Sequence, residues 1–273
     1  MRIATVLHAG VAVTGIALAG IAAVPTAAAA PLPAAPDVAP VPPGGLVTSF
    51  LHNQLVYCSI ICPLLAQTGT TIAVTVQQAP GTFGAARQSG ADPMRAFGVA
   101  AASVTGPTRV AAQESIVADG TEVAPRALNA FEVGVVGLLD IGGAAAGGPP
   151  AIDAAARTAR ADTFAALNAP IVPDPPPLAV PHDATQVAVV AAIDVGAAVI
   201  FPAFNEVLSG AFETTDAAAQ ELAATGDPGR AVAAGADTAT AVRTAAGAIV
   251  TDAIAGANDR IRAAGGQSRS AAG

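Results

Sequence analysis

The stretch DPGRAVAAGADTATAVRTAAGAIVTDAIAGANDRI, residues 227–261, decides the fold class. Asp227 can cap a helix whose first position is Pro228, and small or apolar side chains then recur at helical spacing. These side chains are Val232, Ala239, Val242, Ala246, Ile249, Ala253 and Ile261. Because the aspartates lie off this stripe, the segment is predicted to be a long surface helix that packs on a neighbour.

The same start and stop signals divide the rest of the chain into helices. Asp92 and Asp183 stand where helix caps are expected, and glycine-rich turns mark helix ends. The predicted helices cover 46–66, 93–104, 107–119, 125–141, 150–168, 183–201, 203–224 and 228–263. The sequence therefore predicts an all-α fold, an Ala-rich helical bundle.

One short segment departs from helical periodicity. Ile72, Val74 and Val76 alternate with smaller or more polar residues, which is the period-2 pattern of a half-buried strand. A strand needs a partner for its backbone, and the Val- and Ile-rich residues 186–200 could supply one. The sequence thus leaves two readings of residues 70–78, a short extended segment and a continuation of the preceding helix.

The N-terminal region has the layout of an export signal. Arg2 precedes an apolar stretch, Val11–Val24, and a run of small residues follows it. We expect a signal peptide at 1–29, with an uncleaved anchor helix as the alternative, and a Pro/Ala-rich disordered leader at 30–45. The predicted location is therefore the extracellular space or the cell envelope.

The remaining chain is predicted to be a helical body at 46–264 with a disordered tail at 265–273. Inside the body, residues 169–181 contain six prolines. This segment is either a linker between two regions or a stiff loop on one bundle. We favour a single body, since neither half is rich enough in large apolar residues to form its own core.

Composition excludes one class of partner. The formal net charge is −8, the only Lys or Arg residues are Arg, and no basic patch occurs apart from Arg260, Arg262 and Arg269, which are typical of a helix end and tail, so nucleic acid is not expected as a partner. Only 3% of residues are aromatic and none is Trp, so the core must consist of small side chains that let helices approach closely.

Two segments have the length of a membrane span. Ala184–Phe204 carries Asp194 as its only charge, and Arg126–Gly148 carries Glu132 and Asp140. An acid at the centre of an inserting helix costs about 2.5–3.5 kcal/mol, which the Val, Ile and Phe side chains of the first segment roughly offset. We favour central helices of a water-soluble bundle, and a membrane-embedded protein is the alternative.

The sequence has no recognisable catalytic motif. It lacks H-E-x-x-H, G-x-S-x-G, phosphate-loop and dinucleotide patterns, so no catalytic, cofactor-binding or metal site is predicted. Members of a Ser/His/Asp triad need not be neighbours in sequence, which leaves a hydrolase as a further alternative. Glu206, Glu213 and Asp216 could form an acid cluster or weak cation site, although a solvated acidic face is the simpler interpretation.

Cys58 and Cys62 are the only cysteines. Residues four apart on an intact helix are displaced by about 6 Å along its axis, a poor geometry for a disulfide. A local bridge would therefore require a broken helix, for which Pro63 offers a cause. The sequence leaves three states open, namely a local disulfide, a pair of buried thiols and an intermolecular bridge; a metal site is poorly supported.

The export signal, the Pro/Ala-rich leader, the absence of Lys and the Ala-rich helices together resemble exported actinobacterial proteins of unknown function, particularly of the mycobacterial type. The chain departs from the PE/PPE helical proteins of that group. It has no Trp for a W-x-G turn, and its sole tyrosine, Tyr57, is followed four residues later by Ile61 and not by an acid.

From these observations we expect an exported, non-enzymatic helical protein of the cell envelope or extracellular space, acting through an unidentified protein or lipid partner. The alternatives are a membrane-embedded protein that uses 184–204 and 126–148, and a hydrolase with an unrecognised triad.

Overall fold

The computed structural model describes residues 40–271, with side chains described up to Gly266. All of these residues belong to one compact unit, Asp37–Gly273. The predicted signal peptide and leader residues 30–39 lie outside the described residues. Within 40–271 the chain is helical apart from the connections, the longest of which covers residues 168–183, and it forms no strand. The all-α prediction is confirmed.

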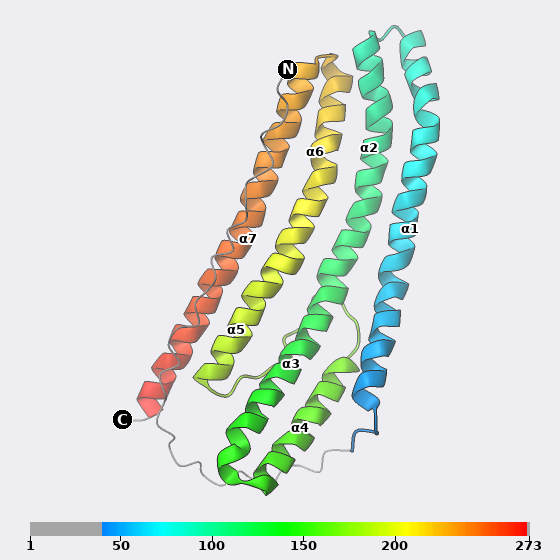
Figure 1. Cartoon of the computed structure of the whole chain (residues 1–273). Helices are drawn as coiled ribbons and strands as arrows, with labels where there is room; N and C mark the ends of the chain where they lie inside the picture. The colour runs from blue at the N-terminus through cyan, green and yellow to red at the C-terminus, as the bar shows by residue number, and fades with distance from the viewer. Residues whose placement is uncertain (1–39, 272–273) are drawn as a thin grey trace, which may run out of the picture. The chain divides into compact units, whose positions relative to one another are not determined.

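Seven α-helices form this unit (Figure 1). They are α1 (Gly45–Gln88), α2 (Pro93–Ala118), α3 (Ala124–Gly143), α4 (Pro149–Leu167), α5 (Ala184–Ala198), α6 (Phe204–Thr225) and α7 (Pro228–Ala271). A 3₁₀ turn, η2 (Ala144–Gly147), links α3 to α4. Helix α1 packs on α2 and α4, α2 packs on α6, and α6 packs on α7, while α3 contacts α4 and α5, and α5 contacts α7.

Two single-turn π-helices replace two of the breaks that the sequence predicted, and the predicted break at 105–106 is absent because α2 continues through Pro107. η1 (Asp119–Val123) joins α2 to α3, and η3 (Val199–Ala203) joins α5 to α6. A proline lies at or just after each turn, Pro125 and Pro202. A proline leaves one carbonyl of the helix without its N–H donor, and a widened turn accommodates that defect without ending the helix. Each pair of helices is therefore continuous.

The predicted helix caps are confirmed. The Asp92 carboxylate accepts hydrogen bonds from the Met94 and Arg95 backbone N–H groups, both at 3.0 Å. Asp183 and Asp227 cap α5 and α7 in the same way. These short side chains satisfy N–H groups that the first turn of a helix leaves unpaired.

The extended segment near 70–78 is not present, because α1 runs unbroken from Gly45 to Gln88. It passes through Pro63 and Pro80, so neither proline ends the helix. Residues 186–200, the suggested partner strand, are also helical. A lone strand would leave its backbone groups unpaired, whereas a helix satisfies them internally. Packing along α2 supports this continuation of α1.

Helix α7 differs from its prediction in two respects. Val242 is buried as expected, but Val232 and Ile261 are exposed, and the residues that α7 buries include Ala231, Gly235 and Ala257. The helix also continues to Ala271, into the segment predicted to be a disordered tail. Small residues form the contact face because α7 approaches α6 closely.

The proline-rich segment 169–181 is a loop on the unit and does not divide it. The Asn129 amide of α3 donates to the Pro176 carbonyl at 3.0 Å, and its carbonyl oxygen accepts from the Leu178 N–H at 3.3 Å. Ala179 packs on the small apolar cluster that includes Ala130 and Val133. The buried side chain of Asn129 therefore binds this loop through both its amide nitrogen and its carbonyl oxygen.

The helices approach one another through glycine and alanine. An ideal Cβ on Gly98 of α2 would lie 2.7 Å from the Ala223 Cα of α6, and one on Gly137 of α3 would lie 2.6 Å from the Ala159 Cβ of α4. No large side chain among the described residues is fully buried. The core therefore consists of small side chains, and many of the large apolar ones lie elsewhere.

Candidate functional site

The polar and apolar side chains of helix α1 are distributed in the opposite way to those of a helix in a water-soluble bundle. The residues it buries are Gly45, Ser49, Asn53 and Tyr57, which recur every four positions. The Asn53 amide donates to the Leu167 carbonyl at 2.8 Å, and the Ser49 hydroxyl exchanges hydrogen bonds with the Asn168 side chain. Polar and small side chains thus face the neighbouring helices, where apolar ones are the rule.

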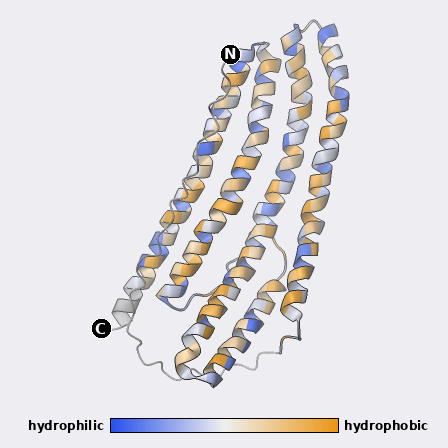
Figure 2. Ribbon diagram, in the orientation of Figure 1, coloured by the Kyte–Doolittle hydropathy of each residue, from blue (hydrophilic) through white to orange (hydrophobic). Residues whose placement is uncertain are grey.

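The large apolar side chains of α1 lie on the opposite face. We call Val47, Leu51, Leu55 and Leu65, together with the Cys58–Cys62 pair, the outer stripe of α1. These positions recur at intervals of three or four and so share one side of the helix. Their leucine and valine side chains are between 56% and 72% exposed. Figure 2 shows hydrophobic positions along the length of α1.

No charge interrupts this surface. From Gly45 to Ala86, a helix length of about 60 Å, α1 contains no Asp, Glu, Lys or Arg. The sequence prediction gave membrane length to Ala184–Phe204, which carries Asp194, and to Arg126–Gly148, and it missed this uncharged run. The signal was present in the printed sequence, but the proline and the alternating valines divided the run into two segments that looked unrelated.

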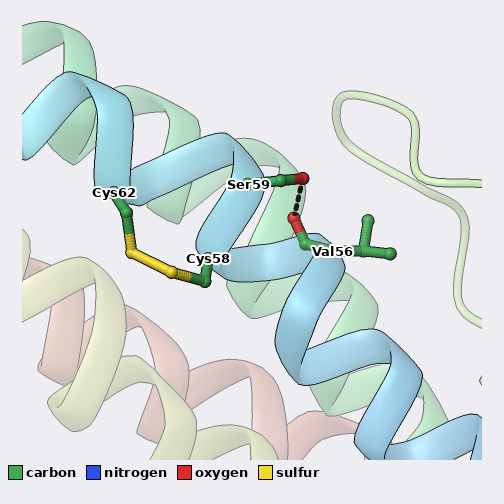
Figure 3. The surroundings of a disulfide bond; sticks show 4 residues. All are labelled: Val56, Cys58, Ser59 and Cys62. Carbon is green, nitrogen blue, oxygen red and sulfur yellow. Dashed lines mark hydrogen bonds between the residues drawn. A yellow bond between two sulfur atoms is a disulfide. The ribbon is translucent and has the colours of Figure 1, made fainter.

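The structure joins the two cysteines of the outer stripe in a disulfide (Figure 3). The helix is not broken there, contrary to the sequence argument. The Cys58 and Cys62 Cα atoms are 5.0 Å apart, which is inside the range of about 4.4–6.8 Å seen in disulfides. Tightening of one helical turn achieves this spacing. Both residues are exposed, so they are not core thiols.

A groove lies on the adjoining side of α1, between α1, α3 and α4. Its cavity volume is about 540 Å³. Phe50 of α1 and Phe131 and Leu138 of α3 form exposed apolar sides, and small residues such as Gly134 and Ala159 form the floor. This size and lining are typical of sites for apolar small molecules. We call it the α1–α3–α4 groove.

Arg160 is the only charged residue that lines this groove. Its Nη2 donates to the Val41 and Pro42 carbonyls at 3.3 and 2.9 Å. Its Nε and Nη1 groups have no partner among residues 40–271, and the side chain is exposed. At the other end, Tyr57 is almost fully buried, and desolvation raises the pKa of its hydroxyl.

A second polar site joins α3, α5 and α7. Glu132 is 4% exposed and shares a hydrogen bond with Asp194, which pairs with Arg260 at 2.5 Å. Burial and the neighbouring Asp194 carboxylate raise the pKa of Glu132 to about 8, although Arg260 opposes the shift. The Glu132 carboxyl is therefore mostly protonated at neutral pH. Both acids come from segments that the sequence singled out as apolar.

The other predicted acidic candidates do not meet. Asp216 turns inward, where it accepts from Thr105 at 2.8 Å and pairs with Arg109 at 3.1 Å. Glu213 contacts the Ser209 hydroxyl instead. Among residues 40–271, no group of three or more His, Cys, Asp or Glu side chains has the arrangement of a metal site.

Three helical stretches are long and apolar enough to cross a membrane, judged by length and composition alone. They are Gly45–Gln88, Pro93–Gly147 and Ala184–Thr225. The last contains Ala184–Phe204, and the second contains Arg126–Gly148 except for its final residue. The first, α1, has the smallest buried share of the three.

Searches against protein families, characterised proteins and solved structures find no match to this chain. The candidate site is therefore described from the structure alone. It consists of the outer stripe of α1, the α1–α3–α4 groove beside it, and the buried carboxyl pair of Glu132 and Asp194.

Proposed function

We propose that this protein is an exported, non-enzymatic component of the cell envelope that binds to lipid through the outer stripe of α1. One observation carries the proposal, the inverted side-chain distribution of α1. The side chains of Ser49, Asn53 and Tyr57 pack inward, whereas the leucines and the valine of the outer stripe point outward. In water this arrangement forfeits about 1.5–3 kcal/mol for each large apolar side chain left exposed, and an apolar phase restores it.

Export to the envelope is supported by the sequence of the N-terminal region, which resembles a secretory signal, and by the actinobacterial, mycobacterial-type composition. The disulfide between Cys58 and Cys62 suits an oxidising compartment. An exported protein whose uncharged helix spans about 60 Å can lie along a lipid surface over a long contact.

A surface contact fits the charges better than a crossing by α3 and α5. Helix α4, which packs on α3, has four exposed charged residues, and the C-terminal half of α7, which packs on α5, has four more. These residues are Asp153, Arg157, Arg160, Asp162, Asp252, Asp259, Arg260 and Arg262. Each charge carried to the centre of a bilayer costs about 2.5–3.5 kcal/mol. The membrane-embedded alternative would have to offset all of them.

Vesicle flotation of the mature protein tests the proposal. Wild-type protein should float with phosphatidylcholine vesicles, and Leu55→Asp should lower the partition coefficient roughly tenfold to a hundredfold. Val47→Asp and Val232→Asp form a matched pair, because the two valines are 64% and 71% exposed on α1 and α7. Only Val47→Asp should weaken flotation.

Two outcomes would overturn the proposal. One is flotation that responds equally to Val47→Asp and Val232→Asp. The other is a wild-type protein that stays with the aqueous phase while sedimentation shows a dimer that Leu55→Asp converts to a monomer. The second result would assign the outer stripe to contact with another copy of the chain. Release of bound protein by carbonate further separates surface contact from a membrane crossing.

A further inference from the structure

We infer that the α1–α3–α4 groove binds one long-chain fatty acid, with its carboxylate held by Arg160 and its chain along Phe50 and Phe131. This inference goes beyond contact with a lipid surface, because it assigns a single molecule to a defined cavity. It shares with the proposed function the premise that the protein encounters lipid.

The shape of the groove matches a single chain. Along α3 its lining extends from Ala127 to Ile141, a rise of about 21 Å, and its volume is about 540 Å³. Alanine and glycine floor the groove, so an extended chain can lie close to the backbone of α3 and α4. The exposed side chains of Phe50, Phe131 and Leu138 stand at its edges, where they would cover the chain.

The single positive charge in the lining of the groove favours a ligand with an anionic head group. Arg160 is its only charged residue, and no carboxylate lines it. The guanidinium keeps its Nε and Nη1 donors unpaired within residues 40–271, while Nη2 is held by the carbonyls of Val41 and Pro42. This anchoring fixes the orientation of the guanidinium. The remaining Nε–H or Nη1–H can then donate a charge-assisted hydrogen bond to one oxygen of a carboxylate.

Two other polar groups that line the groove already have hydrogen-bond partners. The Asn53 amide is already used by the Leu167 carbonyl, and the Thr163 hydroxyl by the Ala159 carbonyl. Tyr57 closes the other end with its ring. The anionic head is therefore assigned to the Arg160 end, and the methyl end of the chain points toward Tyr57.

Calorimetric titration of the delipidated mature protein with tetradecanoate tests this assignment. We expect one bound molecule per chain. Arg160→Gln should lower the affinity at least about tenfold, because a charge-assisted pair is lost. Arg157→Gln, an exposed arginine on the same helix that does not line the groove, is the matched control and should leave the affinity unchanged. Tetradecanol should bind more weakly than tetradecanoate and should not respond to Arg160→Gln.

Two glycines of α3 supply a steric test. A Cβ on Gly134, which lines the groove, would meet Thr163 only at 3.8 Å, so the backbone has room for a side chain there and Gly134→Leu should fill the cavity. Gly142→Leu is the control, because nothing lies within 4 Å of its Cβ. Gly134→Leu should abolish tetradecanoate binding, whereas Gly142→Leu should preserve it.

Absence of binding by wild-type protein, equal affinity for tetradecanol, or unchanged binding by folded Gly134→Leu would overturn the inference. Arg160→Gln, an exposed substitution, keeps the test decisive if Gly134→Leu fails to fold. Failure here is distinguishable from failure of the proposed function, because Val47 does not line the groove. Val47→Asp should lose vesicle flotation and keep tetradecanoate binding, and Gly134→Leu should show the reverse.

Discussion

The closest helix contact in the fold makes Gly98→Ala a strong test of the packing argument. An ideal Cβ on Gly98 would lie 2.7 Å from the Ala223 Cα and closer still to the Ala223 nitrogen, whereas ordinary contact begins at 3.4 Å. The obstacle is backbone of α6 and not a flexible side chain. Helices α2 and α6 would have to separate by at least about 0.7 Å, the difference between the two distances.

This displacement sets the size of the effect. Overpacking a tight core costs about 1–3 kcal/mol, and the rigid obstacle places Gly98→Ala at the upper end. The better helix propensity of alanine returns up to about 1 kcal/mol. The free energy of unfolding should therefore fall by about 2 kcal/mol, which lowers the melting temperature by roughly 4–8 °C for a body of this size.

Denaturant unfolding followed by far-UV circular dichroism measures this change. Gly69→Ala is the matched control, because Gly69 lies inside α1 and its Cβ would have nothing within 4 Å. That substitution should raise the free energy of unfolding by about 0.5–1 kcal/mol. If Gly98→Ala is as stable as wild type, or the two substitutions behave alike, the close approach of α2 to α6 is not a feature of the folded protein.

Two further predictions concern the buried acid and the disulfide. The pKa of Glu132 is raised from 4.5 to about 8 in the folded state, so the folded protein binds more protons than the unfolded chain between these values, and stability should fall as pH rises through that window. In denaturant titrations Glu132→Gln should match the stability of wild type near pH 5 and exceed it near pH 9. A wild-type free energy of unfolding that does not fall between these pH values would show that Glu132 is not a buried, protonated carboxyl. The Cys58–Cys62 bridge lies in the outer stripe, so vesicles should slow its reduction and alkylation, followed by intact mass. Unchanged rates would show that the stripe stays in water, and a wild-type mass that rises by two alkyl groups without reductant would show free thiols.

Much of the fold was predictable because helix signals are local. The caps at Asp92, Asp183 and Asp227 depend on a side chain and the N–H groups two or three residues away, and the structure confirms them. The prolines were less informative. Pro63 suggested a break in α1, yet the helix continues through it and through Pro80, and packing on α2 and α4 supports that continuation.

The candidate site was only partly predictable. The cysteine pair was identified from the sequence, but the sequence argument required a broken helix and assigned the alternative thiols to the core, and the structure contradicts both points. Glu132 and Asp194 were noted separately as acids in apolar segments. Nothing in either segment indicated that the two carboxyls meet, since residues 62 positions apart are brought together only by the packing of α3 on α5.

The sequence by itself determined the helical class, the helix starts capped by Asp92, Asp183 and Asp227, and the small-residue core, because each follows from propensity, capping or composition, which act within a few residues. Only the tertiary structure decided which side of α1 faces outward, that Arg160 stands at an apolar groove, and that the outer stripe contains the disulfide. The helical period shows which residues share a face, but it does not show whether that face points toward the core or toward the outside. Because residues 45–86 of α1 carry no charge, no charged face marks the side toward water.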